Sequence, residues 1–277
     1  GQEATITSWN SATNVDVTVL ETFAGTAADT DWDIQVFNAE NGYQMSVALA
    51  EQRMIIGGGK DFPHGIWMSK TGAFRNFDVG TASADEMIDR PLDSGTIETI
   101  RNIHISDNIE IFTDLAEHYI PLSVTQALTP TFSPVLGPQD INGISAHVPP
   151  QTYDGATVFM QQTGMVLREY LFNDGSDRYT SDGLSLLATH LFQNQDATTG
   201  DDTPADIRGS TVLTGTTRRP ESYYFTVNVG KGEIVQFHSQ RVEKIAGFGR
   251  WTTDGTFSDV MAVGNQLFCG VKREVAG

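Results

Sequence analysis

Cysteine is almost absent from this sequence of 277 residues, which contains only Cys269. A single cysteine excludes an intrachain disulfide, so folding must rest on a packed core instead of covalent links. Cys269 lies in the apolar run from 267 to 271, and no basic cluster surrounds it. We therefore expect a buried structural thiol and not a reactive nucleophile.

Basic residues are also scarce, with 17 Lys and Arg against 35 Asp and Glu, for a formal net charge of -18. A surface of this sign repels nucleic acid phosphates, which disfavours a DNA-reading or polybasic membrane role. Such a charge suits either an ordinary soluble or salt-adapted surface or a conduit that must not adhere to a polyanion. No apolar stretch approaches the roughly 18 residues of a membrane span, so we expect no membrane insertion.

Helical periodicity is nearly missing. The best candidate, residues 181–192, is short, and we expect little helix. Alternation with a period of two is common instead: Val15, Val17 and Val19 alternate with polar residues, as Phe225 and Val227 do. The sequence therefore predicts an all-β fold.

A hairpin pattern recurs along the chain, in which two apolar strands flank a short polar turn. The turns are centred on Gln52, Asn108, Gly164, Lys231 and Asn265, and the first three centres are evenly spaced. A hairpin about every 50 residues is typical of radially repeated β-blades, and about five units would suit this length. We predict a β-propeller-like domain, with a β-sandwich as the alternative because the last spacing is short.

The domain organisation follows from the same patterns. Residues 1–40 contain a separate β-hairpin, and residues 41–277 form the propeller-like domain. The polar stretch 194–206 is predicted to be an exposed loop. The first residues, Gly1-Gln2-Glu3, are compatible with a fragment cut from a longer protein.

Two stretches resemble catalytic motifs. Gly57-Gly58-Gly59-Lys60 lacks the hydroxyl residue and the following helix that a phosphate-binding loop needs, because Asp61 and a Pro63 turn come next. Lys70-Thr71-Gly72 and Ser106-Asp107-Asn108 resemble accessory motifs of penicillin-binding enzymes, but no serine has lysine three positions on. We interpret all of these as turn residues, with Trp67 and Phe74 supplying core to the first unit.

The remaining chemistry-bearing residues do not form a recognisable site. The six histidines are scattered, and His104 and His238 fall in strand patterns as solvent-facing or hydrogen-bonded residues. The segment 173–177 resembles a calcium loop without its glycine and closing glutamate. We therefore assign no catalytic, cofactor-binding or metal-binding residues and no cofactor. Carboxylates are numerous, and propellers can recruit them from different blades, so a carbohydrate-binding protein or glycosidase stays the alternative.

Several segments, taken in order, resemble the tail nozzle proteins of short-tailed bacteriophages, also called tail tubular protein B or tail hub proteins. The first segment, 30–80, carries the most motif positions, and the others are 85–103, 155–192 and 250–274. The matching positions of the first are Asp31-Trp32, Gly42-Tyr43, Arg53 to Gly58, Pro63, Trp67, Ser69, Gly72, Phe74 and Phe77. In the third segment they include Arg168-Glu169, Tyr179 and the stretch 182–190.

The resemblance implies a non-enzymatic structural virion protein with a propeller-like domain. Because members of the family are usually much longer, it also implies that this chain is an internal fragment, with the N-terminal hairpin as the end of an inserted β-domain. Such a protein would be made in the host cytoplasm and incorporated into the phage tail. It would form a homo-oligomeric ring, contact other tail proteins, and let DNA pass during ejection without sequence-specific binding.

Overall fold

The computed structural model describes residues 4–19, 25, 37–79, 81–123, 125–132, 134, 137–195, 202–216 and 221–274. Within these residues the fold is all-β, as predicted, and the only helical element is the 3-10 turn η1, Thr189–Leu191. The predicted N-terminal hairpin is present as β1, Ala4–Ser11, paired with β2, Asn14–Val19. Nothing in the structure tests the proposed boundary near residue 40.

Most of the chain forms antiparallel sheets whose strands pair in sequence order. The first sheet contains β3 Ser46–Ala50, β4 Arg53–Gly57, β5 Ile66–Met68 and β6 Ile88–Asp89. The second contains β7 Ile100–Ile105, β8 Ile109–Thr113 and β9 Glu117–Ile120. The third contains β10 Gln151–Tyr153, β11 Ala156–Met160, β12 Leu167–Asn173 and β13 Arg178–Gly183. The fourth contains β16 Ile207–Leu213, β17 Tyr223–Asn228, β18 Glu233–Gln240 and β19 Ile245–Trp251, and the hairpin of β20 Thr256–Val263 and β21 Gln266–Lys272 follows.

The five predicted hairpins are all confirmed, as β3–β4, β7–β8, β11–β12, β17–β18 and β20–β21. Four of the five turns contain a residue with positive φ: Gly164, Gly232 and Gly264 adopt 71°, 66° and 59°, and Glu51 and Gln52 adopt 52° and 57°. Each hairpin is the nucleus of one sheet, so local turn chemistry sets the register of each unit.

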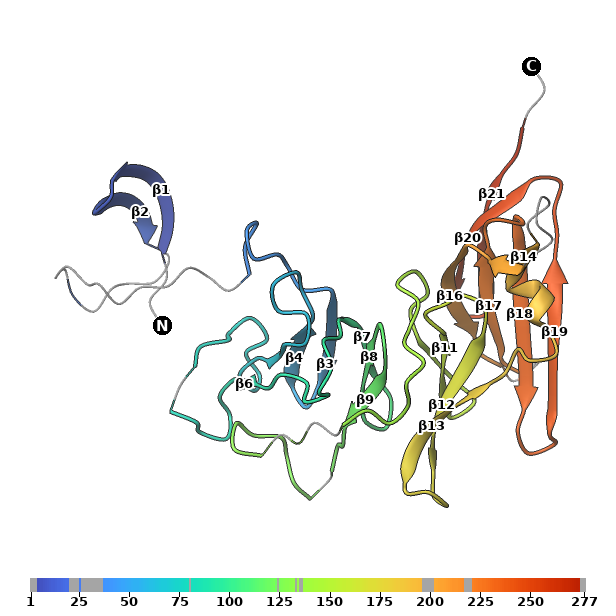
Figure 1. Cartoon of the computed structure of the whole chain (residues 1–277), viewed down its shortest axis with the longest axis horizontal. Coiled ribbons are helices and arrows are strands. Elements are labelled where there is room, and N and C mark those ends of the chain that lie inside the picture. Colours follow the sequence, from blue (N-terminus) through green and yellow to red (C-terminus); the bar gives the residue numbers. More distant parts are fainter. Residues whose placement is uncertain are drawn as a thin grey trace.

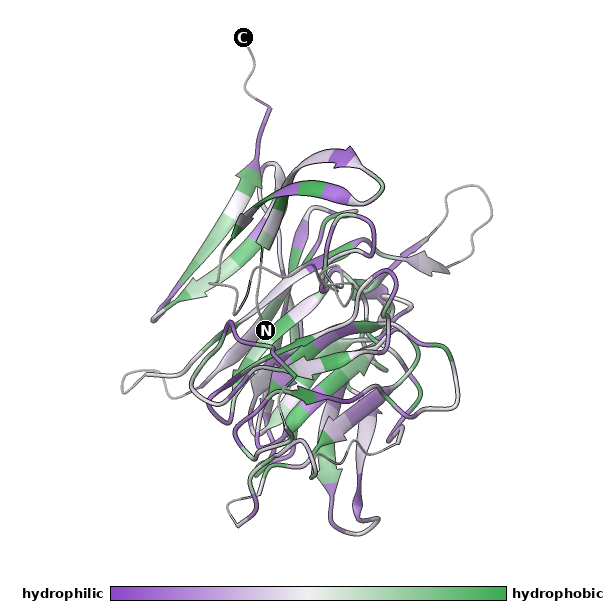
Figure 2. Cartoon of the chain, turned by 90° about the vertical axis from the view of Figure 1, so that its left-hand side faces the viewer, coloured by the Kyte–Doolittle hydropathy of each residue, from purple (hydrophilic) through white to green (hydrophobic). Residues whose placement is uncertain are grey.

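The sheets pack in series, and Figure 1 shows them following one another from the blue to the red end of the chain. An apolar cluster lies at each junction between neighbours. Representative residues are Ile55 and Ile111 for the first junction, Phe112 and Phe159 for the second, Val158 and Phe237 for the third, and Phe225 and Val260 for the fourth. Apolar residues concentrate on the strands and hydrophilic ones on many of the turns (Figure 2). Closure of this series into a propeller stays a prediction.

The Gly57–Pro63 region forms a turn, as predicted, in which the Gly65 N–H donates to the Phe62 carbonyl around Pro63. Trp67 is buried, with Phe37 and Phe62 against its ring at centroid distances of 4.9 and 5.9 Å. Phe74, in contrast, is 43% exposed, so the prediction that it belongs to the core is wrong. Phe74 follows the Lys70–Ala73 bridge in a tight surface turn, and Phe37 and Phe62 cover Trp67 instead.

Two further stretches differ from the sequence pattern. Residues 181–192, the best helical candidate in the sequence, form the end of β13, a loop and η1 instead of an α-helix. The first residues of this segment pair with β12, so they belong to a strand. The predicted loop 194–206 is bracketed by a short pairing of β14, Gln193–Gln195, with β15, Asp202–Pro204. Residues 196–201 lie outside the described residues.

Gly58 and Gly72 provide a matched test of the first sheet. Both have positive φ, 71° and 72°, but a Cβ on Gly58 would lie 2.5 Å from the Ile100 carbonyl oxygen, whereas one on Gly72 meets nothing within 4 Å. We expect Gly58→Ala to lower the free energy of unfolding by about 3 kcal/mol and Gly72→Ala by about 1 kcal/mol. Urea titrations would measure both, and equal losses would contradict the close approach of the first two sheets at Gly58.

Candidate functional site

The most unusual chemistry lies between the second and third sheets. On the second sheet, β8 and β9 pair so that Glu110 stands opposite Tyr119 and Phe112 opposite Glu117. Residues paired in this way share one face of a sheet. Phe112 contacts the rings of Phe159 and Tyr170, at 5.1 and 5.6 Å between centroids, so this face is turned toward the third sheet.

The facing side of the third sheet is aromatic and polar. Thr157 on β11 pairs with Tyr170 on β12. The Tyr170 ring stacks on Tyr179 with centroids 4.5 Å apart and planes 17° apart, and Tyr119 reaches across from the second sheet to within 4.7 Å of Tyr179. We call Glu110, Glu117, Thr157 and Tyr170 the carboxylate junction.

Hydrogen bonding in the carboxylate junction is incomplete. Oε1 of Glu110 accepts a hydrogen bond of 2.6 Å from Ser106, and Oε2 of Glu117 accepts one of 3.4 Å from the Asn142 N–H. Within the described residues, the other carboxyl oxygen of each glutamate has no partner of good hydrogen-bond geometry, and neither have the hydroxyls of Thr157 and Tyr170. All four residues are at most 1% exposed, so these atoms are shielded from solvent as well.

Burial changes the acidity of this site. It raises the pKa of Glu110 to about 7, with Asp107 adding to the rise and the neighbouring hydroxyls of Ser106 and Thr157 opposing it. It also raises the pKa of Glu117 to about 7, with Asp140 adding to the rise and the Asn142 N–H and Arg168 opposing it. The pKa of Tyr170 is raised by burial and by both glutamates, so its hydroxyl stays protonated. Burial therefore brings the pKa of both carboxyl groups close to neutral pH.

A second buried network lies within the N-terminal half of the chain. Glu98 accepts a hydrogen bond of 2.5 Å from Thr113 and contacts the His118 Nε2 at 3.0 Å, and the His118 and Glu98 side chains are fully buried. Burial opposes ionisation of Glu98, but hydrogen bonds from His118, Ser94 and Thr113 outweigh it and lower its pKa. Glu98 precedes β7, and its contacts with Thr113 and His118 fasten this segment to the second sheet. Both side chains are shielded from solvent, so we interpret the network as structural.

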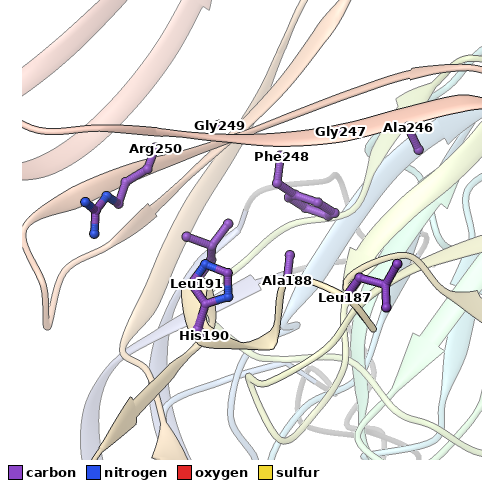
Figure 3. Close-up of a pocket in the computed structure, with 9 residues that line it drawn as sticks. All are labelled: Leu187, Ala188, His190, Leu191, Ala246, Gly247, Phe248, Gly249 and Arg250. Atoms are coloured by element: carbon purple, nitrogen blue, oxygen red, sulfur yellow. The ribbon is translucent and has the colours of Figure 1, made fainter.

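A surface pocket of about 380 Å³ lies between η1 and β19 (Figure 3). Leu187, Leu191 and Phe248 form much of its wall, and His190 and Arg250 are its titratable lining residues. The Leu187 side chain is fully exposed, so this is a shallow surface depression and not a closed active site. The lining offers no carboxylate for acid–base chemistry on a sugar.

The turn motifs have structural partners. The Lys60 ammonium donates to the Glu40 carbonyl at 3.0 Å, and Lys70 bridges to Ala73 in a turn. Asn108 donates to the Tyr179 hydroxyl at 2.6 Å and its carbonyl oxygen accepts from the Leu122 N–H at 2.9 Å. These residues therefore fix turns, as predicted for them.

The predicted histidine and thiol environments are also visible. His104 lies 2.8 Å from the Thr152 hydroxyl and His238 lies 2.9 Å from the Ser222 carbonyl, so both strand histidines are hydrogen-bonded. Cys269 is half-buried against the last apolar cluster, and burial raises the pKa of its thiol. Segment 173–177 is the turn between β12 and β13.

Within the described ranges, no group of three or more His, Cys, Asp or Glu side chains is arranged to hold a metal ion. No helix in this part of the chain is long and apolar enough to cross a membrane. Comparisons with protein-family models and with curated proteins find no match to the chain.

The carboxylate junction was not predicted from the sequence. Its members come from β8, β9, β11 and β12, and Glu110 alternates with Ile109 and Ile111, a pattern typical of a strand with one wet face. The only available signal was the presence of charged residues in strands that otherwise look like core.

Proposed function

We propose that the chain is a structural virion protein, a fragment of a phage tail nozzle or hub that forms part of the DNA-ejection conduit. The observation that carries the proposal is the role of the residues behind the resemblance. Arg53 is 2% exposed and donates to the carbonyls of Ser69, Glu86 and Ala84 at 2.6, 2.5 and 2.8 Å. The Ser69 hydroxyl in turn accepts from the Met54 N–H. The hydrogen bonds of Arg53 and Ser69 thus hold the backbone of the first sheet together, which supports a structural role for these motif residues. Asp31 and Trp32 lie outside the described residues.

The third resembling segment, 155–192, supports the same proposal. Arg168 donates to the Ser181 carbonyl at 2.9 Å and to Gln161 at 3.0 Å. Glu169 forms an ion pair of 2.6 Å with Arg241 of the fourth sheet. These residues join strands within the third sheet or connect that sheet to the next one. Such contacts are those we expect of motif residues with a structural role.

The acidic balance supports passage of DNA without adhesion. Exposed carboxylates such as Asp61, Asp107, Asp182, Glu243 and Asp254 are distributed over successive units. We expect the immobilised chain to retain no duplex DNA at about 50 mM salt, where a basic binder would hold it most tightly. Salt-sensitive retention of DNA would contradict this role.

Assembly with further subunits is supported by the two ends of the series. Val47 and Leu49 on β3 are 62% and 60% exposed, and Met261 and Phe268 on the last hairpin are 60% and 54% exposed. In our proposal these faces meet copies of the chain in a full-length ring or other tail proteins, in a virion-located assembly that is not inserted in a membrane.

A carbohydrate-binding or glycosidase propeller is the competing function. A glycan array and a panel of chromogenic glycosides separate the two, since the nozzle proposal expects neither binding nor hydrolysis. Saturable binding of a glycan that Arg250→Ala abolishes, or turnover of any glycoside, would overturn it in favour of the alternative.

A further inference from the structure

We propose that the contact between the second and third sheets is a protonation-controlled joint, which is closed while Glu110 and Glu117 carry protons and loosens when both become carboxylates. This inference is independent of the proposed function. It rests on the concentration of unpartnered polar atoms at one junction of the fold. Of the six buried side-chain atoms without a partner in the described residues, four belong to the carboxylate junction.

The junction also differs from the others in how its sheets meet. Elsewhere the strands of neighbouring sheets approach closely, β3 with β7, β10 with β16 and β16 with β20. Between the second and third sheets the contact is made by large rings, chiefly Phe112, Phe159 and Tyr170, together with the two glutamates. Side chains therefore carry most of the adhesion between the N-terminal sheets and the C-terminal sheets.

A connecting segment beside this contact is hydrogen-bonded to both sheets. The Ile144 N–H donates to the Thr113 carbonyl of β8, and the Ser145 N–H donates to the Met160 carbonyl of β11. The Asp140 carboxylate accepts from both the N–H and the hydroxyl of Ser181. The connecting segment is thus bonded to both sheets and can hold them together while the aromatic contact opens.

The groups facing the two glutamates do not compensate two negative charges. Around Glu110 are Ser106, Asp107, Thr157, Tyr170 and Tyr179. Around Glu117 are Asn142, Gly143, Asp140, Tyr170 and Arg168.

Arg168 is the only cation among the groups that act on the two glutamates in the described structure, and Gln161 and the Ser181 carbonyl already accept from its guanidinium. Carboxylates formed here face further acidic side chains in a medium of low polarity, so separation of the sheets becomes the favourable response.

The joint is tested by a distance measurement across it. In the full chain with Cys269→Ser, spin labels at Asp61→Cys and Glu243→Cys report the separation of the first and fourth sheets by electron–electron resonance. Both positions are exposed and lie away from the carboxylate junction. We expect one narrow distance distribution at pH 5.5 and a second, longer population at pH 8.5. The ratio of this longer population to the closed form should rise by up to about tenfold per pH unit for each of the two carboxyls between pH 4.5 and about 7, and level off above pH 7.

Matched variants assign the change to the two glutamates. Glu110→Gln with Glu117→Gln mimics the protonated pair and should keep the narrow distribution at both pH values. Glu40→Gln with Glu274→Gln alters two exposed carboxylates and should leave the response of the parent intact. A distribution independent of pH in the parent chain, or an unchanged response in the Glu110 and Glu117 variant, would overturn the joint. Circular dichroism at each pH confirms that the compared chains are folded.

Discussion

Replacing Arg53 by methionine is expected to lower the free energy of unfolding by roughly 3–5 kcal/mol, among the largest effects of any single substitution in the chain. The guanidinium is almost fully buried and donates to three backbone carbonyls, on Ser69, Ala84 and Glu86. Methionine has a stem of comparable length but no donor, so these acceptors would lose their charge-assisted bonds inside the protein.

Arg208→Met is the control for this experiment. Arg208 is 57% exposed in its side chain and pairs with Asp206 at 2.8 Å on the surface, where solvent screens the ion pair and leaves it little effect on stability. Guanidinium chloride titrations of both variants give the comparison. A loss at Arg53 no larger than that at Arg208 would show that the buried arginine does not hold the first sheet together.

The second large effect is a loss of stability as the pH rises from about 4.5 to about 7. Glu110 and Glu117 have an ordinary pKa of 4.5 when unfolded and about 7 when folded. The folded chain therefore binds more protons in this window, and the stabilisation present below pH 4.5 is lost as the pH rises through 7. The shift corresponds to about 3 kcal/mol for each carboxyl.

The difference between the parent and Glu110→Gln with Glu117→Gln isolates this contribution. The two proteins should have similar free energies of unfolding near pH 4.5, and the variant should be the more stable one at pH 8. Asp140, whose pKa is lowered through its hydrogen bonds with Ser181 in spite of burial, acts at lower pH and in both proteins. Parallel stability curves between pH 4.5 and 8 would contradict the buried, protonated state of the two glutamates.

The strands and hairpins could be predicted because they depend on neighbours in sequence. Val15, Val17 and Val19 alternate with polar residues, and Gly164 and Gly264 adopt the positive φ that their turns require. Phe74 could not be placed in the same way. An aromatic residue close in sequence to a buried tryptophan is expected to belong to the core. Phe74 instead follows the Lys70–Ala73 bridge and lies on the surface.

The carboxylate junction could not be predicted from neighbouring residues in the sequence, for a different reason. A glutamate between two isoleucines indicates a strand with one solvated face, and β8 instead has both faces covered because sheets pack against each side of the second sheet. The order of the sheets along the series decides the environment of Glu110. That order is a property of the tertiary structure, and the sequence pattern of β8 alone does not predict it.

The central proposal, that this chain is part of a phage tail, is tested most directly by searching for it in purified virions of a phage that is found to carry its gene. Antibodies raised against the chain, applied to gradient-purified particles and followed by immunogold electron microscopy, should label the tail, and mass spectrometry should find the chain in the same particles. Its absence from purified virions, with the protein confined to the lysate of infected cells, would contradict the claim.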